Sequence, residues 1–136
     1  EQSEFVKLGK ASFEQSNLKF FHNLKECQES EKTNTLLIAC VLQYLEKPHH
    51  QLEELLKGDF EFIVLDRLAL SHTDTDRITV QHVPKSIYQA SYPAWFFSKS
   101  RILKHFKADY ELIYEYPSEE KPNNSGYFAG LVFRKK

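Results

Sequence analysis

Polar side chains follow each apolar run in the first half of this sequence. In an open parallel sheet, ligands bind at the carboxyl ends of the strands, so these positions are where a site is expected. Four places qualify: Glu1-Gln2, His22-Asn23, the segment Cys40 to Tyr44, and Asp66-Arg67. If they meet at one edge of a sheet, they supply hydrogen-bonding groups, two carboxylates and a guanidinium to a common cleft.

A second group of candidates lies in the stretch from Ser71 to Phe97. This stretch has no clear hydrophobic period and is predicted to be a long loop, and long loops inside compact domains are usually functional. It carries His72, Arg77, Gln81, His82, Tyr88, Tyr92 and Trp95. For a hydroxyl substrate, His82, Asp66 or His72 could act as the base. Arg67 and Arg77 could hold a carboxylate or phosphate.

These residues also have purely structural interpretations. Asp66-Arg67 would be a solvated ion pair, His82 a hydrogen-bonded loop histidine, and Cys40 to Tyr44 an ordinary strand edge. The aromatic residues between Tyr88 and Phe97 would be core packing beneath a loop, with Tyr92 and Trp95 as the members most worth testing. His49-His50 opens a helix without carboxylate or cysteine partners at ligand spacing, so no metal site is predicted.

The elements that would position these residues alternate between strands and helices. We expect a helix over Glu4 to Phe13, strands at Leu18 to Phe21, Asn34 to Leu42 and Phe60 to Leu65, and a helix opened by Pro48 and ended by Gly58. The almost wholly apolar run Asn34 to Leu42 is typical of a strand buried on both faces of a parallel sheet. The strand, helix and strand order predicts a parallel crossover in an α/β fold with layers on both sides.

The last third of the sequence predicts a helix and a hairpin. Ser98 or Ser100 caps a helix through Ala108, with Ile102, Leu103 and Phe106 turned inward. Tyr110 to Tyr116 and Tyr127 to Phe133 alternate as strands, and the turn-rich link between them indicates a terminal antiparallel hairpin.

Composition favours one folded domain over residues 1–136. Hydrophobic residues make up 41% and charged residues 27% of the 136 residues, with a net charge of -1 and no long block of like charge. Nucleic acid is therefore not an expected partner. No apolar run is long enough to predict a membrane span, and two cysteines without motif spacing fit a reducing cytoplasm.

The motif order resembles that of class I methyltransferases. Val41-Leu42-Gln43-Tyr44-Leu45 is followed by Pro48 and a helix, and then by Phe62-Ile63-Val64-Leu65-Asp66. A longer match is to a methyltransferase family associated with bacterial surface-polysaccharide gene clusters. Its segments VLQYL, LDR, TVQ.VP..IY.ASYPAW and a closing hairpin occur here in the same order, so the resemblance covers essentially the whole chain.

The resemblance implies a partial Rossmann-like three-layer sandwich, with a mainly parallel sheet that ends in an antiparallel hairpin. It implies an enzyme that transfers a methyl group from S-adenosylmethionine to a small-molecule or saccharide-type acceptor. The cofactor would contact Glu1, His22, Asn23, Cys40, Val41, Gln43 and Tyr44. Glu1, which matches the family's VEQ segment, would accept hydrogen bonds from the ribose hydroxyls. His82 and Asp66 would be catalytic, and the acceptor would contact Arg67, Arg77, Gln81, Tyr92 and Trp95.

The sequence departs from the family upstream. The first strand and the glycine-rich loop are absent, and Gly9, Gly58, Gly126 and Gly130 form no loop motif. With no methionine and a start at Glu1, we expect the C-terminal two thirds of a longer protein, with impaired binding of S-adenosylmethionine and no activity by itself. The alternative is a non-catalytic α/β interaction module that retains the fold.

The same comparison predicts an unpaired strand edge. A class I sheet has the order 3-2-1-4-5-7-6, so the loss of its first two strands would expose the strand at Leu36 to Val41. We expect either a homodimer through that edge or a displaced Leu18 to Phe21 strand paired there.

Overall fold

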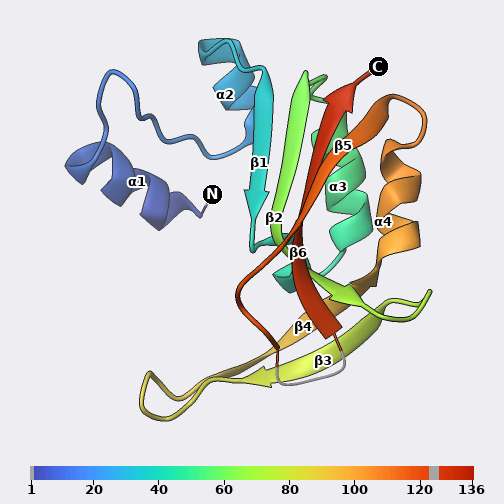
Figure 1. Cartoon of the computed structure of the whole chain (residues 1–136). Helices are drawn as coiled ribbons and strands as arrows, with labels where there is room; N and C mark the ends of the chain where they lie inside the picture. Colours follow the sequence, from blue (N-terminus) through green and yellow to red (C-terminus); the bar gives the residue numbers. More distant parts are fainter. Residues whose placement is uncertain (1, 123–125) are drawn as a thin grey trace. The chain divides into compact units, whose positions relative to one another are not determined.

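A computed structural model describes residues 2–122 and 126–136 (Figure 1). The chain divides into two compact units, Glu1–Asn34 and Thr35–Lys136, which we call unit 1 and unit 2. Each unit is described by itself. The expectation of a single domain over residues 1–136 stays a prediction.

Unit 1 contains two short helices, α1 (Ser3–Ser12) and α2 (Leu24–Ser30). The first agrees with the helix predicted over Glu4 to Phe13. The side chain of Asn23 caps α2 by accepting a hydrogen bond from Glu26 N at 2.9 Å, and the Glu26 carboxylate accepts one from His22 N at 2.9 Å. The pair is similar to a capping box, except that Glu26 accepts from the residue before the N-cap, so His22 and Asn23 have a structural role in starting α2.

The prediction of a strand at Leu18 to Phe21 is wrong. Only an isolated bridge between Gln15 and Leu18 forms there. The ring of Phe20 instead packs against α1 at Gly9, where an added Cβ would lie 2.4 Å from Phe20 Cδ1. A short apolar run can satisfy its burial through one such contact without joining a sheet.

Unit 2 contains one sheet of six strands among its described residues. The strands are β1 (Thr35–Ala39), β2 (Phe62–Ser71), β3 (Arg77–His82), β4 (Ser91–Ser98), β5 (Tyr110–Pro117) and β6 (Gly126–Lys135). The helices are η1 (Leu42–Tyr44), α3 (Pro48–Leu56) and α4 (Lys99–Phe106). The spatial order is β3-β4-β2-β6-β5, and β1 also pairs with β2.

The sheet is mixed, which corrects the expectation of a mainly parallel sheet. β2 pairs in parallel with β1 and β4, whereas the pairs β2 with β6, β3 with β4 and β5 with β6 are antiparallel. The α/β class, the parallel unit of β1, α3 and β2, and the terminal hairpin β5 and β6 are confirmed. The three-layer Rossmann-like arrangement stays a prediction.

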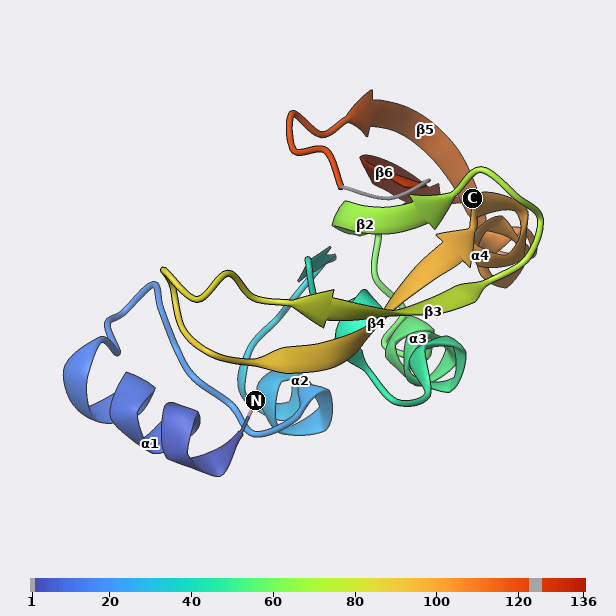
Figure 2. The ribbon, with the colours of Figure 1, turned by 90° about the horizontal axis from the view of Figure 1, so that it is seen from below.

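The prediction of a long loop from Ser71 to Phe97 is wrong, because most of this stretch forms the hairpin of β3 and β4. Figure 2 shows these two strands as a long arm, which we call the β3–β4 arm. Its β-branched residues Ile78, Thr79 and Val80 suit an extended strand. Ile78 and Val80 are exposed, whereas Arg77 and Thr79 on the other face of the strand are half-buried.

Strand β2 pairs with two different strands along one of its edges. β6 pairs along one edge from Phe62 to Ser71, so β1 and β4 must share the other edge. β1 occupies it from Phe62 to Asp66, and β4 occupies it at Leu70 and Ser71. The register against β6 shifts between Leu65 and Leu68. Asp66-Arg67 therefore lies at a bulge inside β2, and not after the end of a strand as predicted.

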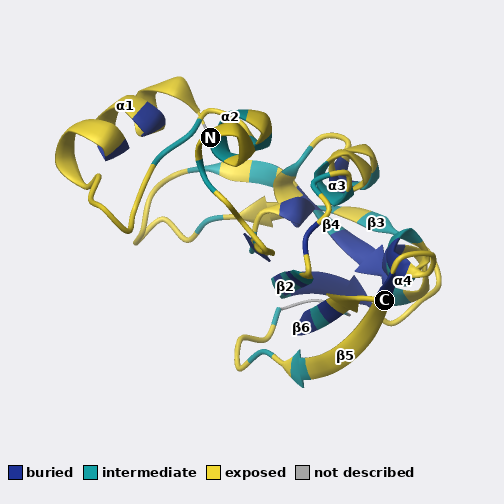
Figure 3. Ribbon diagram, turned by 90° about the horizontal axis from the view of Figure 1, so that it is seen from above, coloured by how far each residue is buried: buried dark blue, intermediate teal, exposed yellow. Residues whose placement is uncertain are grey.

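The core of unit 2 lies between the sheet and helices α3 and α4. Phe106 of α4 stacks on Phe133 of β6 with ring centroids 3.8 Å apart, and Leu52 and Ile102 are fully buried. Figure 3 shows buried positions concentrated in β2 and β4. Leu37 of β1 is 62% exposed, so the prediction of a strand buried on both faces is wrong. β1 has only one paired edge in the described part of unit 2.

The helix boundaries follow local signals in the sequence. Pro48 occupies the first turn of α3, as predicted. Ser98 caps α4 by accepting a hydrogen bond from Arg101 N, and α4 ends at Phe106, two residues before the predicted Ala108. Gly58 does not have the left-handed conformation expected of a terminating glycine. Asp59 adopts it instead, with φ of 57°.

Candidate functional site

Two strained residues meet where β1 ends and β2 bulges. Cys40 and Arg67 have positive φ angles of 54° and 49°, although neither is glycine. The backbone joins them, because Cys40 N donates a hydrogen bond to Asp66 O at 2.9 Å. Such conformations are costly for residues with a Cβ and concentrate at functional sites. We call the polar residues around this point the strand-end cluster: Cys40, Gln43, Tyr44, Asp66, Arg67, Gln81 and Tyr92.

Gln43 lies at the centre of the cluster. Its side chain is almost fully buried, at 1% exposure. Its Nε2 donates to Arg67 O at 3.2 Å and lies 3.2 Å from Cys40 Sγ. Its Oε1 is buried and has no hydrogen-bond partner among the described residues. A buried acceptor without a donor costs free energy of folding, so the Gln43 amide is an energetically unfavourable feature of the site.

Tyr44 connects the cluster to the β3–β4 arm. Its hydroxyl donates to Gln81 Oε1 at 3.1 Å, and its ring meets that of Tyr92 edge to face at 5.5 Å. Burial raises the pKa of Tyr44, and a hydrogen bond with Tyr88 raises the pKa of Tyr92. Both phenols are therefore protonated at neutral pH and can donate hydrogen bonds.

Asp66 is oriented by two neighbours. Tyr116 donates to its Oδ1 at 2.7 Å, and this hydrogen bond raises the pKa of Tyr116. The Arg67 Nε lies 3.5 Å from Asp66 Oδ2, and Arg67 Nη1 lies 3.5 Å from Glu120. Tyr116 covers Gly130, where an added Cβ would lie 2.0 Å from Tyr116 Cζ. Glycine at position 130 therefore allows the tyrosine to reach Asp66.

Other predicted site residues lie outside this cluster. His82 is exposed and, by strand alternation, emerges on the face of the β3–β4 arm opposite to Gln81. Arg77 stacks its guanidinium on Phe96 at 5.5 Å. Trp95 donates from Nε1 to Leu45 O at 3.1 Å, so it anchors the segment after η1. Val41 is exposed beside the cluster.

Three predicted cofactor contacts are not among the described residues of unit 2. His22 and Asn23 belong to unit 1, and Glu1 lies outside the described residues. His72 stacks on Tyr127 with ring centroids 5.0 Å apart, which gives it a packing role. The catalytic, cofactor and acceptor roles of all these residues stay predictions.

Sequence reasoning missed a second polar cluster, which we call the Asp76 cluster: His49, Glu53, Asp76, Ser98, Arg101 and His105. The Asp76 carboxylate is only 4% exposed, and it accepts hydrogen bonds from Ser98 N at 2.8 Å and from His49 Nε2 at 2.7 Å. Arg101 Nη1 lies 2.7 Å from the same carboxylate. The cluster thus connects α3, α4 and the segment before β3.

The two histidine rings of the Asp76 cluster are hydrogen-bonded to each other. His49 Nδ1 lies 2.8 Å from His105 Nε2, so one of these nitrogens donates to the other. Burial lowers the pKa of His105, and the neighbouring His49 adds to this effect. The signal in the sequence was weak, because positions 49, 76 and 105 are far apart. No group of three residues suited to hold a metal ion occurs in the described ranges.

A scan against protein-family models finds no match for this chain, and searches of curated proteins and of solved structures find none either. Across residues 2–122 and 126–136, no helix is both long and apolar enough to cross a membrane.

Proposed function

We propose that the protein is an S-adenosylmethionine-dependent methyltransferase that acts on a small-molecule or saccharide-type acceptor. The observation that carries the proposal is the strand-end cluster. It places two strained non-glycine residues and a buried amide at the carboxyl end of β1, where open α/β sheets bind ligands. The resemblance of the motif order adds support, because Gln43, Tyr44 and Asp66 all belong to the matching segments.

The strand order is compatible with this proposal. The path β1-β2-β6-β5 runs in the same spatial order as strands 4-5-7-6 of a class I sheet. The β3–β4 arm is an addition to that order, inserted between β2 and α4. It delivers Gln81 and Tyr92 to the strand-end cluster, so a variable insertion would contribute to the acceptor side of the site.

The described residues do not by themselves fit the whole cofactor. A nucleoside and amino-acid ligand needs a close approach of backbone N–H groups, which a glycine-rich loop provides. The described glycines all have negative φ, and Gly9, Gly126 and Gly130 lie in regular helix or strand.

The chain's own residues can still position an acceptor. Methyl transfer depends mainly on the orientation of the acceptor atom. Tyr44 and Tyr92 offer hydroxyls and ring faces, and Arg67 offers a cation that is 43% exposed. Asp66, held by Tyr116, is the carboxylate best placed to take a proton from a hydroxyl acceptor.

Ligand binding at the strand-end cluster can be tested by NMR, which detects even millimolar affinity. Titration with S-adenosylhomocysteine should shift the amide signals of Cys40 to Tyr44 and of Asp66-Arg67. The Gln43→Ala variant should lose most of these shifts, whereas Gln51→Ala on the exposed side of α3 should keep them. If neither S-adenosylhomocysteine nor S-adenosylmethionine shifts these amides, the proposed function is wrong.

A non-catalytic α/β interaction module is the second candidate. The described glycines favour it, because none of them forms the backbone loop that a nucleotide-like ligand requires. The cofactor titration separates the candidates, because even weak binding of S-adenosylhomocysteine at the strand-end cluster is expected only of a methyltransferase. A folded protein that shows no such binding would be an interaction module.

A further inference from the structure

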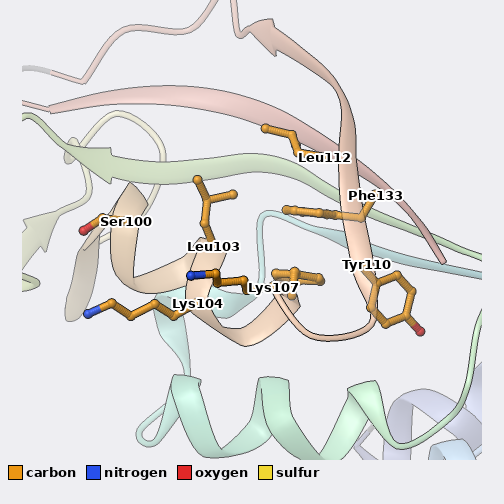
Figure 4. A pocket seen from close by; sticks show the side chains of 8 residues that line it. Ser100, Leu103, Lys104, Lys107, Tyr110, Leu112 and Phe133 are labelled. Carbon is orange, nitrogen blue, oxygen red and sulfur yellow. The ribbon is translucent and has the colours of Figure 1, made fainter. Parts of the chain in front are cut away.

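A surface groove of about 370 Å³ lies between α4 and strands β5 and β6 (Figure 4), and it shares no lining residue with the strand-end cluster. Its volume falls in the range of small-molecule sites. The residues around it are Ser100, Leu103, Lys104, Phe106, Lys107, Tyr110, Leu112 and Phe133. We call it the α4 groove. It depends on no residue of the proposed methyltransferase site.

The floor and walls of the α4 groove are apolar. Phe106 and Phe133 stack face to face and are each 1% exposed, so they form a rigid floor. Tyr110 presents its ring edge to Phe106, and its hydroxyl donates to Phe60 O at 2.9 Å. That hydroxyl is therefore already paired. Leu112 remains 38% exposed and forms part of the open wall.

Two lysines make the rim of the groove cationic. Lys104 and Lys107 line it, and neither ammonium has a carboxylate partner in the described part of the chain. Lys99, one turn earlier on α4, is instead paired with Glu115. An apolar groove with two unpaired cations is complementary to an apolar ligand that ends in an anion.

We propose that the α4 groove binds a single-chain anionic amphiphile, of which an alkyl carboxylate is the simplest form. The alkyl chain lies along Leu103, Leu112 and the Phe106 and Phe133 rings, where each methylene buried removes apolar surface from water. The carboxylate lies at the rim, between the ammonium groups of Lys104 and Lys107. Burial of the alkyl chain supplies the affinity, and the lysines favour an anionic head group over a cationic one.

The test is a calorimetric and NMR titration with hexanoate, octanoate and decanoate as monomers. Affinity should rise about twofold to fourfold for each methylene added, as expected when a chain is partly to fully buried. Decyltrimethylammonium, with the same chain and the opposite charge, should bind at least about tenfold more weakly. Equal binding of the two head groups would overturn the proposal.

Variants separate this site from non-specific binding. The double variant Lys104→Gln/Lys107→Gln should weaken decanoate binding about fivefold to tenfold, the effect of two exposed ion pairs. The matched control Lys85→Gln/Lys121→Gln makes the same change in net charge at exposed positions outside the groove. It should bind decanoate normally. Equal losses in both double variants would show non-specific attraction and would contradict the proposal.

A third variant tests the apolar wall. Leu112→Glu places a carboxylate in the groove at a partly exposed position, and it should abolish decanoate binding while the thermal unfolding stays cooperative. If the protein dimerises with increasing concentration and Leu112→Glu prevents this, a second copy occupies the groove. That outcome would also refute binding of an amphiphile. Retention of decanoate binding by Leu112→Glu would place the ligand elsewhere.

Discussion

Asp76 holds three parts of unit 2 together through one nearly buried carboxylate, so its removal should cost far more than an ordinary surface substitution. In Asp76→Ala, Ser98 N and His49 Nε2 lose acceptors at 2.8 Å and 2.7 Å. A hydrogen bond to a charged group contributes about 1.5–3 kcal/mol. Arg101 is half exposed, so its ion pair adds at most about 1 kcal/mol. These contributions sum to about 3–7 kcal/mol if they are independent. Because all three contacts share one carboxylate, they are not fully additive. The expected loss is therefore about 3–5 kcal/mol, in line with breaking one side of a buried pair.

Urea unfolding followed by the fluorescence of Trp95, the one tryptophan, reports on unit 2 and measures this loss. A loss of about 3–5 kcal/mol is a large share of the roughly 5–15 kcal/mol that stabilises a typical domain. Asp76→Asn keeps the shape and one acceptor, so it should lose less. The control Asp74→Ala removes only a 3.4 Å contact with Ser100 and should lose under about 1 kcal/mol. If Asp76→Ala behaves like Asp74→Ala, the reasoning is wrong.

Three further predictions concern His105, Gly130 and Cys40. Burial lowers the pKa of His105 in the folded protein below its ordinary value of 6.5. The neutral imidazole therefore stabilises the fold fully above about pH 6.5, and this stabilisation is lost as the pH falls through the lower pKa of the folded state. Unfolding measured against pH should show this loss in the native protein and not in His105→Gln. Gly130→Ala should destabilise by about 1–3 kcal/mol because it displaces Tyr116. Adding Tyr116→Ala should cost less than the sum of the single changes, and strict additivity in a double-mutant cycle would argue against that contact. Cys40→Gly should raise stability by about 1 kcal/mol in thermal unfolding, because glycine adopts positive φ without strain. A lower melting temperature would show that the Cys40 side chain is worth more than the strain.

The elements predicted correctly are those with strong local signals. Pro48 and Ser98 fix the starts of α3 and α4, and two strand-like segments joined by a turn-rich link indicate the terminal hairpin. The β3–β4 arm was not predicted, although Arg77 to Gln81 alternates polar and apolar residues as a strand does. The bulge at Asp66 arises from a change of sheet partner along β2, and that change depends on residues far away in the sequence.

The candidate site was predictable in part. The prediction that Cys40 to Tyr44 lies beside Asp66-Arg67 is confirmed, although Asp66-Arg67 lies at a bulge inside β2 and not at its carboxyl end. The role of Gly130 beneath Tyr116 was not visible, because it depends on the register of β5 against β6. The Asp76 cluster was missed for a similar reason, since its members meet only after α3 and α4 pack together.

The change of partner along β2 also affects how the protein opens. Asp66 O and Arg67 O accept hydrogen bonds from Cys40 N and Gln43 Nε2 at the point where β1 gives way to β4. The amide proton of Cys40 can therefore exchange with solvent only when this junction opens. Its exchange rate reports the local opening free energy of the sheet. A ligand that closes over Gln43 would slow that exchange before any change in overall stability could be measured.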